Sequence, residues 1–134
     1  MLALAGDGGY PYAVPLSYIY DGGKLYFHCA PVGHKLDALQ NSDKASFCVI
    51  GRDEILPEKF TTCFRSVIAF GRVRLLTEDG ERREALEKLA EKYSPGIPAE
   101  KEIEGAWDRV CLLELSVEHL SGKEAIELVR AQKQ

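Results

Sequence analysis

A predicted strand that leads directly into a predicted helix carries the residues best suited to hold a phosphate group. Residues 26–35 read as the end of a strand followed by the first turn of a helix, and such a turn presents unpaired backbone N–H groups. His34 and Lys35 add side-chain donors at the same end. A basic pair at a helix start is more often solvated surface, so this spacing leaves both interpretations open.

A second unusual feature is an arginine inside an otherwise apolar strand. Arg65 and Ser66 are followed by Val67, Ile68 and Ala69, and burying an unpaired guanidinium is costly. Arg65 could bind a phosphate through two parallel hydrogen bonds while Ser66 donates its hydroxyl. Alternatively, Arg65 pairs with a carboxylate at a strand or subunit edge. Together with His34 and Lys35, the two residues would form a compact cationic pocket.

The cysteines and histidines form no metal-binding pattern. Four cysteines are spread over the chain without a C-x-x-C pair, and the three histidines lack the spacing of metal ligands. Each cysteine lies in an apolar run, as small buried residues of a cytoplasmic protein do. We therefore predict no metal site.

Length and charge limit the possible functions. The chain has 134 residues, 46% of them hydrophobic, which is enough for one core, so we expect a single domain over residues 1–134. The net charge of -4 argues against nucleic acid or an anionic membrane as the main partner. Neither a signal peptide nor a bilayer-spanning stretch is evident, so we expect a cytoplasmic protein.

The first half of the chain reads as strands joined by turns. Strands are predicted at residues 2–5, 10–20, 24–30 and 45–50, with glycine-rich turns at 6–9 and 21–23. Pro11 and Pro15 cannot donate to a strand ladder, which places part of the second strand at an edge or bulge. A short helix is predicted at 33–40, and residues 51–60 are predicted to form a loop.

In the second half of the chain, the spacing of the hydrophobic residues changes from that of strands to that of a helix and back. A long strand is predicted at 61–76 with a bend at Gly71, and an amphipathic helix follows at 81–93. An acidic loop then leads to Trp107, and a half-buried strand is predicted at 111–117. A capping box predicts that a last helix starts at Ser121. This order predicts an α+β domain with a mainly antiparallel, barrel-like sheet rather than an alternating βαβ fold.

Three motifs resemble one known family. Residues 10–18 (YPYAVPLSY), residues 25–35 (LYFHCAPVGHK) and residues 65–71 (RSVIAFG) are similar to the pyridoxamine 5'-phosphate oxidase-related flavoproteins, and most similar to the branch that contains nitroimidazole-resistance proteins. Residues 118–124 also match, so the resemblance covers nearly the whole chain. It implies an antiparallel split β-barrel with flanking helices that binds FMN between the two subunits of a homodimer.

The resemblance also implies a role for each motif. The backbone of Val14, Pro15, Leu16 and Ser17 would hold the flavin ring, and Lys35, His34, Arg65 and Ser66 would hold its phosphate. The strand end formed by His28, Cys29 and Ala30 would lie at the cofactor. His28 would approach the ring or the substrate as a catalytic residue, or be a packed strand residue. Trp107 would cover the partner's flavin or be ordinary packing.

Three functions remain open. The first is an oxidoreductase that moves electrons from a nicotinamide donor through FMN to a small acceptor such as a nitroaromatic. The second is a non-catalytic flavin carrier or sensor, and the third is a haem or deazaflavin binder on the same barrel. Relatives carry a helical lead before the first strand, so Met1 would be an internal or shortened start. The branch lacks the full substrate motifs for vitamin B6 oxidation.

Overall fold

The computed structural model describes residues 1–133 and contains one antiparallel sheet with four α-helices. The strands are β1 (Leu2–Ala5), β2 (Pro11–Val14), β3 (Ile19–Asp21), β4 (Lys24–Cys29), β5 (Lys44–Leu56), β6 (Thr61–Leu75) and β7 (Cys111–Glu124). The helices are α1 (His34–Asn41), α2 (Asp79–Tyr93), α3 (Glu100–Ala106) and α4 (Ile126–Gln132), with short 3-10 turns η1 (Asp7–Gly9), η2 (Pro57–Lys59) and η3 (Trp107–Arg109).

The two edges of the sheet are adjacent in the sequence. The strand order is β2-β1-β5-β6-β7-β4-β3, so β2 and β3 lie at opposite edges although four residues separate them. These residues, 15–18, must therefore cross from one edge to the other, which curls the sheet toward a barrel that is not closed by hydrogen bonds. The predicted α+β class and antiparallel sheet are confirmed.

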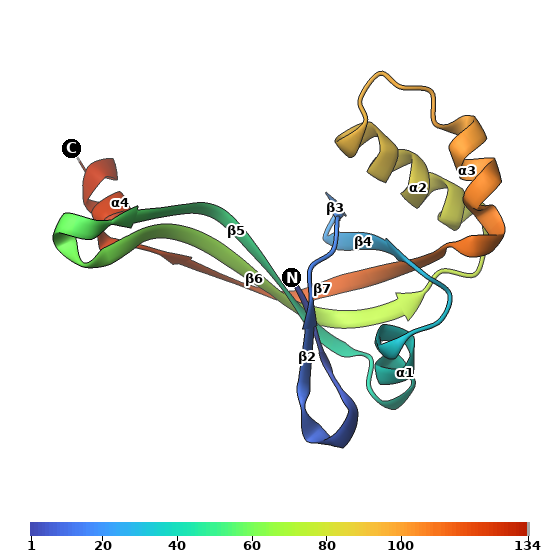
Figure 1. Cartoon of the computed structure of the whole chain (residues 1–134), viewed down its shortest axis with the longest axis horizontal. Helices are drawn as coiled ribbons and strands as arrows, with labels where there is room; N and C mark the ends of the chain where they lie inside the picture. Colours follow the sequence, from blue (N-terminus) through green and yellow to red (C-terminus); the bar gives the residue numbers. More distant parts are fainter. Residues whose placement is uncertain (134) are drawn as a thin grey trace.

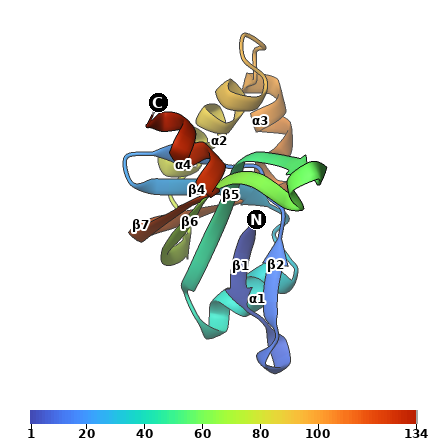
Figure 2. The same cartoon turned by 90° about the vertical axis from the view of Figure 1, so that its left-hand side faces the viewer.

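The sheet encloses one main core and is covered on two sides by helices. Phe27, Phe47 and Leu115 are fully buried inside the curl, and Leu89 of α2 packs with Leu112 on the outer face in a second cluster. Figures 1 and 2 show α1 beside the β1–β2 hairpin and α2 with α3 on the opposite side of the sheet. The strand at 111–117, expected to be half-buried, is covered on both faces over residues 112–115.

The outer parts of β5, β6 and β7 form an arm that projects from the body and carries α4 at its end (Figure 1). Two predictions are wrong here. Residues 51–56 are not a loop, because they pair with residues 61–65 of β6. The last helix does not start at Ser121, because residues 121–124 pair with β6 and α4 begins at Ile126. Cross-strand partners override the turn and cap signals of the local sequence.

The predicted bend at Gly71 is confirmed as a shift of register between β6 and β7. A Cβ atom at this position would lie 1.9 Å from the carbonyl oxygen of Ser116, so only glycine fits the close approach of the two backbones. Two other elements differ from expectation. Residues 10–20 form two strands rather than one, since they pair with different partners, and the acidic loop contains α3, anchored by buried Ile103.

Candidate functional site

Residues 15–18, which connect the two sheet edges, leave backbone groups unpaired. Within residues 1–133, neither Leu16 nor Ser17 makes a backbone hydrogen bond to another backbone group. The predicted alternation still holds, because Tyr12, Val14, Leu16 and Tyr18 all pack against the main core. The connection thus offers free amide and carbonyl groups next to an apolar surface, as a planar ligand with a polar edge requires.

The end of α2 holds this connection in place. The backbone N–H of Tyr18 donates to the hydroxyl of Tyr93 at 2.8 Å, and that hydroxyl donates to the carbonyl of Tyr18 at 3.0 Å. Lys92 donates to the same carbonyl at 2.7 Å and lies 3.4 Å from the centre of the Tyr18 ring. Two side chains of one helix therefore replace the strand partner that Tyr18 lacks.

The hydrogen bonds also change the acidity of Tyr93. Burial alone would raise the pKa of the phenol, but the Tyr18 backbone and the Lys92 ammonium lower it further than burial raises it. The net effect is a pKa below the ordinary value. Helical periodicity predicted that Tyr93 faces inward; the partner of its hydroxyl has no signal in the sequence.

His28 and Cys29 lie on opposite faces of β4. Cys29 faces the core, directly across from Cys111 of β7, and burial raises the pKa of its thiol despite the positive charge of Lys35. His28 is exposed on the face that α2 covers farther along the strand, and Ala30 follows at the exposed strand end. Of the two candidate residues of β4, His28 is thus the one that a solvent-borne molecule can reach.

The predicted phosphate-binding turn is the first turn of α1. Gly33 precedes this helix with φ of 142°, a conformation that side chains disfavour, and His34 and Lys35 occupy its first two positions. The ring of His34 lies 6.2 Å from that of Tyr12 in β2. The strand-to-helix turn and its two basic residues are therefore arranged as the sequence predicted.

Arg65 and Ser66 lie on the arm, separate from that turn within one chain. Arg65 pairs with Glu124 of β7 at 3.4 Å, which matches the carboxylate alternative stated for it. The register places Tyr12 level with Ala45 of β5, whereas Ser66 is opposite Ile50. Five residues of extended strand correspond to about 16 Å. A compact pocket of all four residues therefore does not form within a single chain.

Trp107 packs against the start of α2. The guanidinium of Arg82 lies 4.2 Å from the centre of the indole ring and that of Arg83 lies 5.5 Å from it. Arg82 also donates to the carbonyls of Trp107 and Val110 at 2.8 and 3.1 Å. Within one chain Trp107 is thus a packing residue that fixes the connection between α3 and β7.

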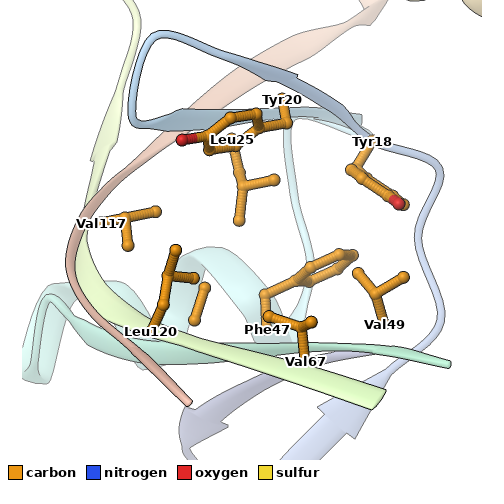
Figure 3. A pocket seen from close by; sticks show the side chains of 9 residues that line it. Tyr18, Tyr20, Leu25, Phe47, Val49, Val67, Val117 and Leu120 are labelled. Carbon is orange, nitrogen blue, oxygen red and sulfur yellow. The ribbon is translucent and has the colours of Figure 1, made fainter. Parts of the chain in front are cut away.

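Two cavities adjoin the connection at residues 15–18. One, of about 270 Å³, is almost wholly apolar and lies between the β3–β4 hairpin and strands β5–β7, where the side chains of Tyr18, Leu25, Phe47 and Leu120 point toward one another (Figure 3). The other, of about 430 Å³, lies between β4, α2 and α3 and includes Ser17 and His28 in its walls. Sequence periodicity identified the α2 residues of the larger cavity, but not those of α3, which was predicted as a loop, and it gave no signal for the spaces themselves.

Within residues 1–133, no three His, Cys, Asp or Glu side chains are grouped so that they could hold a metal ion. No helix over the same residues is long and apolar enough to cross a membrane.

The sequence matches a known protein family. Residues 1–124 match the family model described as pyridoxamine 5'-phosphate oxidase. No curated protein matches the sequence significantly.

Solved structures share the fold. A candidate 5-nitroimidazole antibiotic resistance protein from Bacteroides thetaiotaomicron is 22% identical with a TM-score of 0.76, over 90% of this chain and 73% of that one. A FAD-binding protein from Mesorhizobium loti is 28% identical with a TM-score of 0.63, over 92% and 83%. A FAD- and haem-binding protein from Mycobacterium smegmatis is 23% identical with a TM-score of 0.72, over 97% and 70%.

Proposed function

Because the chain belongs to the pyridoxamine 5'-phosphate oxidase family, whose fold is a split barrel, we propose that it is a flavoprotein that binds FMN between two copies of itself. The observation that carries the proposal is the unpaired backbone at Leu16 and Ser17, beside exposed His28 and close to an apolar core. This combination fits a flavin, which has an apolar planar ring with a polar edge. The similarity to a FAD-binding protein also supports a flavin ligand.

The cofactor phosphate belongs at the first turn of α1. Lys35 supplies a full positive charge there, His34 supplies a ring donor, and the helix start supplies backbone N–H groups. The flavin ring would then extend along the backbone of residues 14–17 toward His28, Cys29 and Ala30. These side chains and backbone groups would hold and orient the ring, and Cys29 would stay a buried neutral thiol.

Arg65 and Ser66 enter the site only if two chains contribute to it. In one chain these residues are displaced from α1 along the sheet, but the arm projects from the body and could bring them to a second copy. The arm and the adjoining open cavity expose apolar side chains that water disfavours: Ile55, Phe60, Val67, Phe70 and Leu120. These exposed residues support a homodimer with the flavin at its interface.

We propose that the loaded protein is an oxidoreductase. When bound, FMN would supply the two-electron redox chemistry between a nicotinamide donor and a small acceptor such as a nitroaromatic. The chain would bind and orient these molecules, and the imidazole of His28 would donate a proton to the acceptor or orient it. Similarity to the Bacteroides thetaiotaomicron protein is one reason to test nitro compounds first.

The second candidate is a carrier or sensor that binds flavin without turnover, and the third is a haem binder. The third is favoured by one observation: a protein of similar fold from Mycobacterium smegmatis binds both FAD and haem. A deazaflavin would fit the same backbone groups as FMN.

The absorption spectrum of the purified protein separates these candidates. We expect flavin bands near their usual positions and release of FMN, identified by mass, after denaturation. Anaerobic addition of NADH or NADPH should then bleach the flavin bands. A Soret band without flavin bands, or a spectrum without any chromophore after reconstitution with FMN, would contradict the flavin proposal. Bound FMN that neither nucleotide reduces would favour the carrier or sensor.

A further inference from the structure

The cavity between β4, α2 and α3 has the size and lining of a small-molecule site. Its volume is about 430 Å³, and ligand-binding clefts are commonly about 300–1,000 Å³. Ser17 and His28 form one part of its wall, and α2 and α3 form the rest. Because both residues also belong to the proposed flavin site, a molecule in this cavity would lie next to the flavin ring.

We propose that this cavity binds a small, largely apolar ring compound that is uncharged or positively charged, and that it rejects phosphate esters. This inference rests on the proposed function in one respect only, namely that the bound molecule would contact a flavin. The selectivity for charge follows from the lining of the cavity itself.

The walls of the cavity are mainly apolar. Leu86 and Leu89 of α2 face Ile103 of α3 across it, and Val110 closes the end toward β7. Alanine occupies three further wall positions, 90, 99 and 106, where a larger side chain would fill the space. Such a lining gains free energy by removing an apolar ring from water and offers little to a strongly hydrated group.

One formal charge lines the cavity, and it is negative. The side chain of Glu102 in α3 is exposed at its edge and makes no hydrogen bond or ion pair with any other side chain in the described part of the chain. The hydroxyl of Tyr93 is occupied by Tyr18, which leaves the imidazole of His28 and the hydroxyl of Ser17 as polar groups for orienting a ligand. A carboxylate at the edge attracts an ammonium group and repels a phosphate.

Among residues 1–133, no lysine or arginine lines the cavity, and two cations close to it, Lys92 and Arg82, are engaged elsewhere. Lys92 donates to the carbonyl of Tyr18 and lies over the Tyr18 ring. Arg82 donates to the carbonyls of Trp107 and Val110, so its charge is held behind the wall. A phosphate ester entering the cavity would therefore meet Glu102 without a compensating cation.

Three probes that share one ring test this selectivity: 4-nitrobenzyl alcohol, 4-nitrobenzylamine and 4-nitrobenzyl phosphate. Isothermal titration into the full-length protein, with and without FMN, measures the affinity of each one. We expect the amine to bind as tightly as the alcohol or up to about fivefold tighter, as for an exposed ion pair. The phosphate should bind roughly tenfold more weakly or worse. A phosphate that binds as tightly as the alcohol would overturn the proposal.

Substitutions in the cavity wall test whether the probes bind there. Glu102→Gln should remove any preference for the amine and leave the alcohol unchanged, whereas Glu104→Gln, on the side of α3 that faces Trp107, should change neither. Ala106→Leu should weaken binding of the alcohol by filling the cavity. If Ala106→Leu has the same midpoint temperature of unfolding as the wild type and still binds the alcohol normally, the probes do not bind in this cavity and the proposal is overturned. If the protein cannot bind FMN but probe binding still responds to these variants, the proposal of a bound flavin fails and the proposal of a ligand site in this cavity stands.

Discussion

Lys35 is the side chain on which phosphate binding by α1 depends most directly. It carries the only full positive charge in the first turn of that helix. We expect Lys35→Ala to weaken FMN binding by about 1.5–3 kcal/mol, the range for a hydrogen bond to a charged group. Fluorescence titration of the FMN-free protein measures this change. Lys101→Ala, in the first turn of α3, removes the same charge away from the site and should leave the affinity unaltered.

Arg65 is a different case because it already has a partner within its own chain. Its ion pair with Glu124 joins β6 to the end of β7. We expect Arg65→Ala to weaken FMN binding by the dimer. Glu124→Gln removes the ion pair but keeps the arginine, and it should leave the affinity for FMN unchanged. An equal loss of FMN affinity in the two variants would show that the structure of the arm, rather than the arginine itself, is needed. Parallel titrations of both variants measure this.

Glu114 makes the stability of the protein depend on pH in the acidic range. The carboxylate is buried in β7 and bonds to Arg74 at 3.0 and 3.2 Å. Burial raises its pKa, but Arg74 and Lys24 lower it further, to below the ordinary value of about 4.5. A carboxylate whose pKa is lowered by folding stabilises the protein above its unfolded pKa and loses that contribution as pH falls through the folded value.

We therefore expect Glu114→Gln to destabilise the protein by about 1–3 kcal/mol at pH 7. The difference from wild type should shrink as the pH falls below 4.5 toward 3. Urea unfolding at several pH values measures both. Glu54→Gln is the matched control, because Glu54 pairs with Arg52 at 2.8 Å where both side chains are exposed, and such a pair is worth little. A loss for Glu114→Gln that is equal at pH 7 and pH 3 would contradict the assignment.

At the scale of elements, α2 acts on the connection between β2 and β3 through Tyr93. We expect Tyr93→Phe to keep the fold and to lose about 0.5–1 kcal/mol of stability, the low end for a hydrogen bond, because the Tyr93 hydroxyl is partly exposed. The amide of Tyr18 should then exchange with deuterium faster, since its acceptor has gone. Exchange at Leu115, in the middle of β7, is the internal reference and should stay slow. Unchanged exchange at Tyr18 would mean that the hydroxyl does not hold the connection.

Elements defined by their own periodicity were predictable. The spacing of Leu86, Leu89 and Ala90 predicted the helix at 81–93, which the structure extends by one half-turn to Asp79. The arm was not predictable, because Asp53 and Glu54 are poor strand formers and read as loop. Only pairing with β6, which depends on residues nine or more positions away, makes them a strand.

The residues of the candidate site also divide into those whose placement was predictable from the sequence and those whose placement was not. His34 and Lys35 at the start of a helix follow from local sequence, since a helix start is a local feature. The separation of Arg65 from that turn depends on register across four strands, β2, β1, β5 and β6, which single-sequence patterns do not encode. The role of Tyr93 depends on a helix meeting a connection 75 residues away.

At the scale of the whole molecule, the apolar cavity of Figure 3 is the feature that a second copy would cover. We expect Val67→Glu, which places a charge in its wall, to convert a dimer into a monomer and to reduce FMN binding. Ile97 is also exposed, at 66% against 42% for Val67, but it lies in the loop between α2 and α3, so Ile97→Glu should leave the mass unchanged. Light scattering measures both masses. A wild-type monomer that binds FMN tightly would contradict the shared site.

The strand order also decides when the chain can fold during its synthesis. The β5–β6 pair is joined by a short turn and can form as soon as both strands have left the ribosome. Strand β4 can pair with β3 early, but its other edge must wait for β7, because Lys24 pairs with Ser116. Until then that edge is unpaired, and Leu25 and Phe27 lack their neighbours in β7. We expect ribosome-bound chains that end before β7 to be sensitive to protease in the β3–β4 region and to need a chaperone there.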